Sequence, residues 1–360
     1  MRFTGKKSNR STAFAAAILA VALALALGIS AVLTGAGCAD TPTVVTSTAA
    51  ETAPTTTAPP YQRQVLTFFR GIDEPRPDAW QDVTGDRAQL RTDGFNIVVL
   101  GPPVLITPRS GGQPRIILQG AADSAPGVAE EIHNAGLSVF IAPTTAAKGY
   151  SQVVDPSDTT LSHLTDDATS WAQTAEEKQA ELFSPLDEYN LALGTDAANK
   201  WSAAVLPLVK QKYTGPVVAK VVPDISTAPA PPGAQHDFEK LDYKGYDYLM
   251  LDIYPHGETL DEAAFEAQVN EILARANAIA QRDGLKGVLL EFGAWREESG
   301  TDKIDGPVFG EDNQALVTGA IMKLSMPQIQ GFFWRGWTLS GRGAKGHKVE
   351  DVLRQSFSGM

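Results

Sequence analysis

The chain has 360 residues, of which 43% are hydrophobic and 20% are charged, and its formal net charge is -12 at pH 7. This composition is ordinary for a globular protein and argues against wholesale disorder, because a full hydrophobic core can form. Phosphate backbones are bound by clustered Lys and Arg, and no such cluster lies beyond the N-terminal segment, so nucleic acid is not expected as a partner. Without that segment, the length fits one large barrel domain or two smaller domains.

The first 38 residues have the pattern of a bacterial export signal. Basic residues within the first ten positions precede an apolar run over 13–33. The run ends in Leu33-Thr34-Gly35-Ala36-Gly37-Cys38, which resembles a lipobox, although lipoboxes usually carry Leu at the position of Gly35. Cys38 is the only cysteine, so an intramolecular disulfide is excluded. We therefore expect the signal to be cleaved before Cys38 and this residue to be lipidated.

An uncleaved membrane anchor is the alternative interpretation, since the apolar run is about long enough to cross a bilayer of roughly 30 Å. Residues 39–62 follow as a spacer of mainly Thr, Ala, Pro, Val and Ser, which cannot bury enough apolar surface to fold. In both interpretations the domain at 63–360 lies outside the cytoplasm. We expect it at the extracellular face of the bacterial cell membrane, with secretion as a further alternative.

From Leu66 onward, short apolar runs rich in β-forming residues alternate with longer amphipathic stretches, which is typical of βα units and a parallel sheet. Their starts lie 28 to 43 residues apart, enough for a crossover helix and a loop in each unit. The eight expected strands are 67–72, 95–100, 137–142, 180–183, 216–222, 246–253, 287–292 and 329–334. Eight similar units predict closure into a single (β/α)8 TIM barrel, an α/β fold.

Helices are expected where apolar residues recur at three- and four-residue spacing. These stretches are 127–134, 166–179, 195–212, 260–282 and 313–324. An open doubly wound sheet is the alternative fold, and it would need a Gly-rich phosphate loop after its first strand. The chain instead has Asp73-Glu74-Pro75-Arg76-Pro77 at that point, which is unsuited to a pyrophosphate. The barrel is therefore favoured.

In such barrels the functional residues follow the C-terminal ends of the strands. Several ionisable or aromatic side chains occur at these positions: Arg70, Asp73, Asp187, Glu188, Asp252, Tyr254, Glu291, Trp334 and Arg335. Glu291 is the most informative, because it ends the apolar run Val288-Leu289-Leu290 and burying a carboxylate there costs several kcal/mol unless it has partners. We expect a functional role for Glu291.

Glycosidic bond cleavage needs one carboxyl group to protonate the leaving oxygen and another to attack the sugar or to activate water. Glu188 and Glu291 are 103 residues apart in the chain. After strands four and seven of a barrel, however, they would face each other across its mouth. The pair predicts glycosidase chemistry.

The segments Glu181-Leu182-Phe183-Ser184-Pro185-Leu186-Asp187-Glu188 and Leu289-Leu290-Glu291-Phe292-Gly293 resemble those of the retaining (β/α)8 glycosidases, a clan that includes cellulases, β-mannanases and β-galactanases. This resemblance implies that Glu188 is the acid/base and Glu291 the nucleophile. It also implies that Tyr254 contacts the nucleophile and that Trp334 forms the floor of the sugar site. Asp252 is expected to support these groups or to cap the loop that contains Pro255.

Two departures from the clan concern substrate contacts. The clan has Asn before its acid/base, whereas this chain has Asp187, which can accept a hydrogen bond from a sugar hydroxyl but cannot donate one while ionised. Its charge would raise the pKa of Glu188, which suits a general acid. The clan often also has an arginine after strand two, whereas this chain has Gly101-Pro102-Pro103, and we expect Arg70 to replace that charge.

Other chemistries lack their motifs. The five histidines show no HxH or HExxH spacing, so no metal and no cofactor are expected, and no G-x-S-x-G elbow indicates a serine hydrolase. The leading hypothesis is a membrane-tethered, monomeric retaining glycosidase that acts on a cell-surface or environmental polysaccharide. A non-catalytic carbohydrate-binding or cell-wall lipoprotein and a transglycosylase are the alternatives, and the sugar and the linkage stay open.

Overall fold

The computed structural model describes residues 61–74, 77–107, 115–116, 121–145, 153–223, 237–255, 261–296 and 308–360. The predicted signal segment with Cys38 and the predicted spacer up to Pro60 lie outside these residues. Within the described ranges, no helix is long and apolar enough to cross a lipid bilayer.

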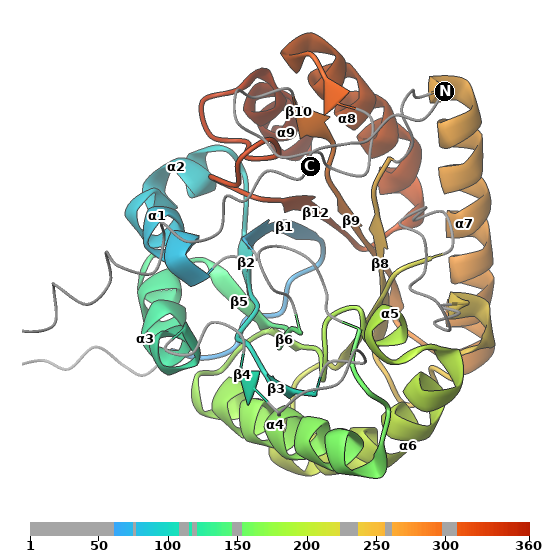
Figure 1. Ribbon diagram of the computed structural model, residues 1–360. Coiled ribbons are helices and arrows are strands. Elements are labelled where there is room, and N and C mark those ends of the chain that lie inside the picture. The colour runs from blue at the N-terminus through green and yellow to red at the C-terminus, as the bar shows by residue number, and fades with distance from the viewer. Residues whose placement is uncertain are drawn as a thin grey trace, which may run out of the picture. The chain divides into compact units, whose positions relative to one another are not determined.

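A closed sheet of parallel strands forms the centre of the domain (Figure 1). In chain order the strands are β1 (Phe69–Glu74), β2 (Ile97–Leu100), β5 (Ser138–Ile141), β6 (Leu182–Phe183), β7 (Val218–Val221), β8 (Tyr248–Ile253), β9 (Gly287–Phe292) and β12 (Gly331–Arg335). Their hydrogen-bonded order is β6-β5-β2-β1-β12-β9-β8-β7, and a parallel bridge between Phe183 and Val217 joins the two ends. Each of the eight predicted strands is confirmed, as is the (β/α)8 barrel.

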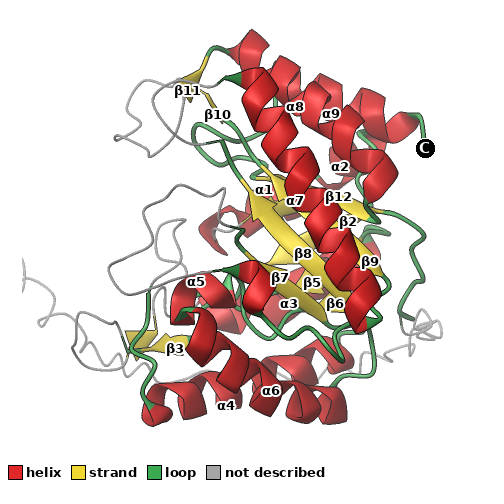
Figure 2. Cartoon of the chain, turned by 90° about the vertical axis from the view of Figure 1, so that its right-hand side faces the viewer, coloured by secondary structure: helices red, strands yellow, loops and turns green. Residues whose placement is uncertain are grey.

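Helices surround the sheet (Figure 2). They are α1 (Trp80–Gly85), α2 (Arg87–Thr92), α3 (Ala121–Asn134), α4 (Asp158–Glu177), α5 (Tyr189–Leu193), α6 (Thr195–Lys212), α7 (Glu262–Asp283), α8 (Glu311–Ser325) and α9 (Lys348–Ser358). The prediction for α6 has the observed bounds, whereas α4 begins eight residues before its predicted start at 166. Its polar first turns hide the periodicity, and the Ser157 side chain caps the helix by accepting from the Thr160 backbone N–H.

Short strands pair with one another in the loops. The strands β3 (Leu105–Ile106) and β4 (Arg115–Ile116) are antiparallel, and β10 (Trp295–Arg296) and β11 (Val308–Phe309) are parallel. Both pairs lie in loops that leave the C-terminal ends of barrel strands, the end at which such folds carry their function.

Side chains on the barrel strands alternate between the barrel interior and the helix layer. One buried apolar cluster fills the interior and includes Phe69, Val218, Met250, Leu289 and Phe333. A second, larger cluster lies between the strands and the helices. Because of the two-residue period, the inward positions nearest the C-terminal ends carry charged side chains: Asp73, Lys220, Asp252, Glu291 and Arg335.

The chain enters the barrel at the opposite end. The Tyr61 ring stacks on His133 with 3.6 Å between ring centroids, and its hydroxyl donates to Glu181, which directly precedes β6. Arg63 Nε donates to the Ala180 carbonyl oxygen at 2.6 Å. The start of the described domain is therefore held at the N-terminal ends of the strands.

Candidate active site

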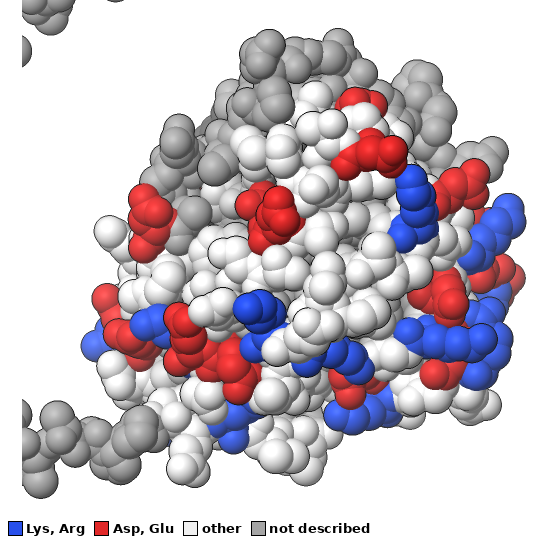
Figure 3. All heavy atoms as spheres, turned by 90° about the horizontal axis from the view of Figure 1, so that it is seen from below, with Lys and Arg blue, Asp and Glu red and all other residues white. Residues whose placement is uncertain are grey.

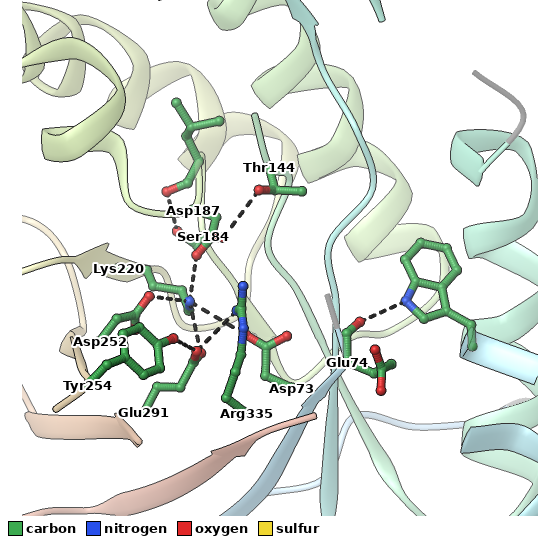
Figure 4. A network of polar contacts seen from close by, with 12 residues as sticks. Asp73, Glu74, Thr144, Ser184, Asp187, Lys220, Asp252, Tyr254, Glu291 and Arg335 are labelled. Atoms are coloured by element: carbon green, nitrogen blue, oxygen red, sulfur yellow. Dashed lines mark hydrogen bonds and ion pairs between the residues drawn. The ribbon is translucent and has the colours of Figure 1, made fainter. Parts of the chain in front are cut away.

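Buried charged side chains from several barrel strands converge at the C-terminal ends of these strands (Figure 4). Lys220 of β7 is at the centre of the group. Its Nζ lies 2.5 Å from Asp187 Oδ1, 2.5 Å from Asp252 Oδ2, 2.9 Å from Glu291 Oε2 and 3.6 Å from Asp73 Oδ2. The Lys220 side chain is fully buried, so these carboxylates are what compensates its charge.

Glu291 is the second-last residue of β9, and its Oε1 accepts hydrogen bonds from two side chains. Arg335 Nη1 lies 3.1 Å from Oε1 and also 2.8 Å from Asp73 Oδ2. The Tyr254 hydroxyl donates to the same Oε1 of Glu291, which is the contact expected from the resemblance. These donors fix the orientation of the carboxylate.

The same contacts set the ionisation of Glu291. Burial by itself would raise the pKa of Glu291, but the positive charges of Lys220 and Arg335 and hydrogen bonds from Asp73 and Tyr254 bring it well below its ordinary value. Burial lowers and the surrounding carboxylates raise the pKa of Lys220, and the carboxylates dominate. Glu291 is therefore a carboxylate, and Lys220 an ammonium, at neutral pH.

The cluster contains more acids than bases. The carboxyl groups of Asp73, Asp187, Asp252 and Glu291 share the two cations Lys220 and Arg335. Burial, followed by repulsion from Glu291, raises the pKa of both Asp73 and Asp252 well above the ordinary value. Protons on these two groups would reduce the negative charge that Lys220 and Arg335 have to balance, which is favourable away from water.

Asp187 and Glu188 lie in the segment after β6. Both oxygens of Asp187 are occupied, because Lys220 contacts Oδ1 and the Thr144 hydroxyl donates to Oδ2 at 3.2 Å. The Glu188 side chain is buried, and its negative charge contributes to the raised pKa of Asp252. Glu188 therefore lies within electrostatic reach of the cluster.

The backbone of Glu188 is strained. Its φ of 48° and ψ of 41° lie in the left-handed region, which costs a non-glycine residue roughly 1–2 kcal/mol. Its carbonyl oxygen accepts from the N–H groups of Leu191 and Ala192, both at 3.0 Å, and so starts α5. Such strain persists where the surrounding structure fixes it, often at functional sites.

Two of the predicted substrate contacts need correction. Trp334 is fully buried on the outer side of β12, where it packs against Phe292 at 6.0 Å and donates from Nε1 to the Arg342 carbonyl oxygen. It cannot form the floor of a sugar site. Trp334 was placed wrongly because the strand extends to Arg335, so the inward positions are Phe333 and Arg335.

Arg70 is the second correction. It lies between the inward-facing Phe69 and Gly71 of β1 and pairs in register with Phe332, a member of the outer cluster. By strand alternation its side chain faces the helix layer rather than the mouth. Arg335 supplies the guanidinium that contacts Glu291.

The sequence-based prediction missed Lys220. The available signal was a single lysine inside the apolar run Val217-Val218-Ala219-Lys220-Val221-Val222, since lysine is almost never fully buried unless it is paired. Asp73 and Arg335 were recognised only as residues at strand ends. Within the described ranges, no group of His, Cys, Asp and Glu side chains is arranged to hold a metal ion.

The surface gives no sign of a polyanion-binding face where it is visible. On the face seen from below Figure 1, Lys and Arg side chains are interspersed with Asp and Glu and form no single patch (Figure 3). Phosphate backbones are bound by concentrated positive charge, which this face does not present.

No protein-family model matches the chain, and no curated protein matches it. Solved structures do match. A GH113 β-mannanase from Alicyclobacillus acidocaldarius is 17% identical with a TM-score of 0.61, and the match covers 82% of this chain and 98% of that one. A GH113 β-1,4-mannanase is 12% identical with a TM-score of 0.62, and the match covers 82% and 100%.

A β-glucuronidase from Dictyoglomus thermophilum is 14% identical with a TM-score of 0.55, and the match covers 82% of this chain and 51% of that one. At these identities the likeness establishes the fold. The resemblance to (β/α)8-barrel glycoside hydrolases is therefore confirmed at the level of structure.

Proposed function

We propose that the protein is a retaining glycoside hydrolase in which Glu291 is the nucleophile and Glu188 the acid/base. The observation that carries this proposal is the setting of Glu291. It is an ionised carboxylate at the mouth of the barrel, oriented by Arg335, Lys220 and the Tyr254 hydroxyl. A nucleophile of this kind needs to be charged and held in one orientation before the substrate arrives.

The reaction would proceed in two displacements. In the first, a carboxylate oxygen of Glu291 forms a bond to the anomeric carbon while the glycosidic bond breaks and Glu188 transfers its proton to the leaving oxygen. In the second, Glu188 takes a proton from water, whose oxygen attacks the anomeric carbon and releases Glu291.

Neutral sugars suit this site better than uronic acids. The cluster has four carboxyl groups against two cations, and both cations are occupied by protein carboxylates. A further carboxylate on the substrate would have to compete with these protein carboxylates for the same two cations. Because two of the similar structures are β-mannanases, we propose β-1,4-linked mannosides as the first substrate class to test, ahead of glucuronides.

A hydrolysis assay with matched variants tests the proposal. Purified protein containing residues 59–360 is incubated with manno-, gluco- and galacto-configured oligosaccharides, alongside glucuronides, and the products are separated by chromatography. Glu291→Gln and Glu188→Gln should each lose turnover while remaining folded. Glu181→Gln is the control, since Glu181 is equally buried but lies at the other end of the barrel. Full activity in Glu291→Gln would exclude the assignment, and binding without cleavage would favour a carbohydrate-binding protein.

We also propose that the domain is tethered to the outer face of the cell membrane through Cys38. The lipobox-like segment in the sequence, which ends at the only cysteine of the chain, supports this. Metabolic labelling with a palmitate analogue tests the anchor. Label should enter the wild type and be absent from Cys38→Ala, whereas equal labelling would exclude lipidation at Cys38.

A further inference from the structure

We propose that Lys220 is a positioning residue of the active site: it joins Asp187, Asp252 and Glu291 into one frame without itself contacting the substrate. This inference rests on the proposed function for its link to catalysis. The ion-pair unit formed by Asp187 and Lys220 can be tested independently of any activity.

The contacts of Lys220 with three buried carboxylates support a positioning role. An ammonium group has three N–H donors. Three carboxylate oxygens lie within 2.9 Å of Nζ, from Asp187, Asp252 and Glu291. The side chain is also fully buried. Nζ donates to Asp187 and Asp252 and forms an ion pair with Glu291 Oε2. Lys220 is therefore surrounded by protein carboxylates and acts through them.

A covalent role for Lys220 is disfavoured by the same contacts. An amine that attacks a carbonyl carbon must lose its proton, and enzymes promote that loss with apolar or cationic surroundings. Lys220 contacts the carboxylates of Asp187, Asp252 and Glu291, and Asp73 lies 3.6 Å away. Its ammonium form is stabilised, which suits an ion-pair partner and not a nucleophile.

The Asp187 and Lys220 pair forms a neutral unit within the site. Removing Lys220 alone would leave Asp187 and Glu291 in a buried space with Arg335 as the remaining cation of the cluster. Removing Asp187 and Lys220 together takes away one negative and one positive charge, so the net charge of the cluster is preserved. A buried pair typically tolerates loss of both partners better than loss of one. Loss of Lys220 alone should therefore destabilise the protein more than loss of Asp187 and Lys220 together.

The charge on Glu291 is set by groups from every side of the barrel mouth. Lys220 of β7 and Arg335 of β12 are the cations. The acidic neighbours are Asp73 of β1, Asp252 of β8, and Asp187 and Glu188 after β6, and the Tyr254 hydroxyl donates to Glu291. Loss of Lys220 leaves the acidic neighbours in place, so Glu291 should take up a proton more readily.

The experiment compares wild type, Lys220→Met, Asp187→Asn and the double variant Asp187→Asn/Lys220→Met. The first measurement is the pH dependence of kcat/KM on an aryl glycoside that the wild type cleaves. In Lys220→Met the acidic limb should move upward by about one pH unit, a tenfold gain in proton affinity, and kcat/KM should fall about 100-fold. In the double variant, the acidic limb should move part of the way back to its wild-type position, and kcat/KM should recover in part.

The second measurement is the free energy of unfolding of the same four proteins in urea, which needs no substrate. The effects of the two single substitutions should not add, and the double variant should be more stable than Lys220→Met. Lys220→Arg is the variant to use if Lys220→Met fails to fold, and it should keep an acidic limb near that of the wild type.

The two measurements separate the inference from the proposed function. If the wild type cleaves no glycoside, the proposed function fails and the unfolding cycle alone decides the ion-pair unit. Additive effects on unfolding would overturn the inference in either case. An unchanged acidic limb in a folded, active Lys220→Met would overturn the positioning role.

Discussion

Arg335 Nη1 lies 3.1 Å from Glu291 Oε1 and 2.8 Å from Asp73 Oδ2. The guanidinium of the last barrel strand thereby links the carboxylate of the preceding strand to that of the first. All three side chains are buried, so water does not weaken the interaction. The side chain of Arg335 therefore spans the paired strands β1 and β12 and also orients the proposed nucleophile.

Arg335→Met should therefore reduce both stability and activity. Breaking a buried ion pair by removing one partner costs about 3–5 kcal/mol. Unfolding in urea measures this loss, and kcat/KM should fall in parallel because Glu291 loses a cation that keeps it ionised. Arg335→Lys is the matched control and should recover part of both. A folded Arg335→Met with wild-type kcat/KM would mean that Arg335 has no role at Glu291.

Tyr254→Phe should lower activity without affecting the fold. The substitution removes only the hydroxyl that donates to Glu291, and loss of one such donor typically lowers kcat by about 100-fold. Tyr243→Phe is the control, since the Tyr243 hydroxyl is also buried but donates to the Phe238 carbonyl oxygen. Steady-state kinetics gives the kcat of Tyr254→Phe and of Tyr243→Phe for comparison with the wild type. Equal activities would show that the Tyr254 hydroxyl does not act in the reaction.

Asp252→Asn should become more stable relative to the wild type as the pH rises. The folded-state pKa of Asp252 is raised by burial and by the charge of Glu291. Asp252 therefore contributes its full stabilising free energy to the wild type below about pH 3.9, the ordinary pKa of aspartate. Between that pH and the folded-state pKa, this stabilisation falls by about 1.4 kcal/mol per pH unit. Because Asn cannot ionise in the unfolded chain, Asp252→Asn does not lose this stability as the pH rises.

Urea unfolding of Asp252→Asn and wild type at pH 5 and pH 8 measures this difference. The exposed Asp196→Asn is the control and should follow the wild type at both pH values. A difference between Asp252→Asn and wild type that stays constant from pH 5 to pH 8 would contradict a protonated Asp252 in the folded protein.

Trp334→Ala should cost stability and leave substrate affinity intact. Trp334 packs in the outer cluster, and truncating a buried tryptophan to alanine costs about 3–5 kcal/mol. The KM of the folded variant, measured below its unfolding temperature, should match that of the wild type. A large increase in KM with little loss of stability would restore Trp334 as a sugar platform.

The barrel could be predicted from the sequence because its strands are buried on both faces and read as continuous apolar runs. Leu289 and Leu290 of β9 both lie in the core, one inside the barrel and one outside. That property makes the strands visible and hides which face each residue takes. The prediction therefore located Glu291 at its strand end correctly and placed Trp334 on the wrong side.

Lys220 could not be assigned its contacts from the sequence, because its partners come from separate barrel strands and from the segment after β6. Asp187 was recognised as a departure from the resembled motif, but the reason for the departure lies 33 residues later in the chain, at Lys220. The carboxylate of Asp187, which departs from the resembled motif, is paired with the ammonium group of Lys220 on another strand. Only the closed sheet brings the two within 2.5 Å.

The most direct test of the central claim is covalent trapping of the nucleophile. The domain is incubated with 2-deoxy-2-fluoro-mannosyl and 2-deoxy-2-fluoro-glucosyl fluorides, digested, and analysed by mass spectrometry. We expect one sugar to be attached to the peptide that contains Glu291, and we expect Glu291→Gln to abolish the label. A sugar attached to Glu188 or Asp187, or glycoside cleavage with no trapped intermediate and inverted product configuration, would contradict it.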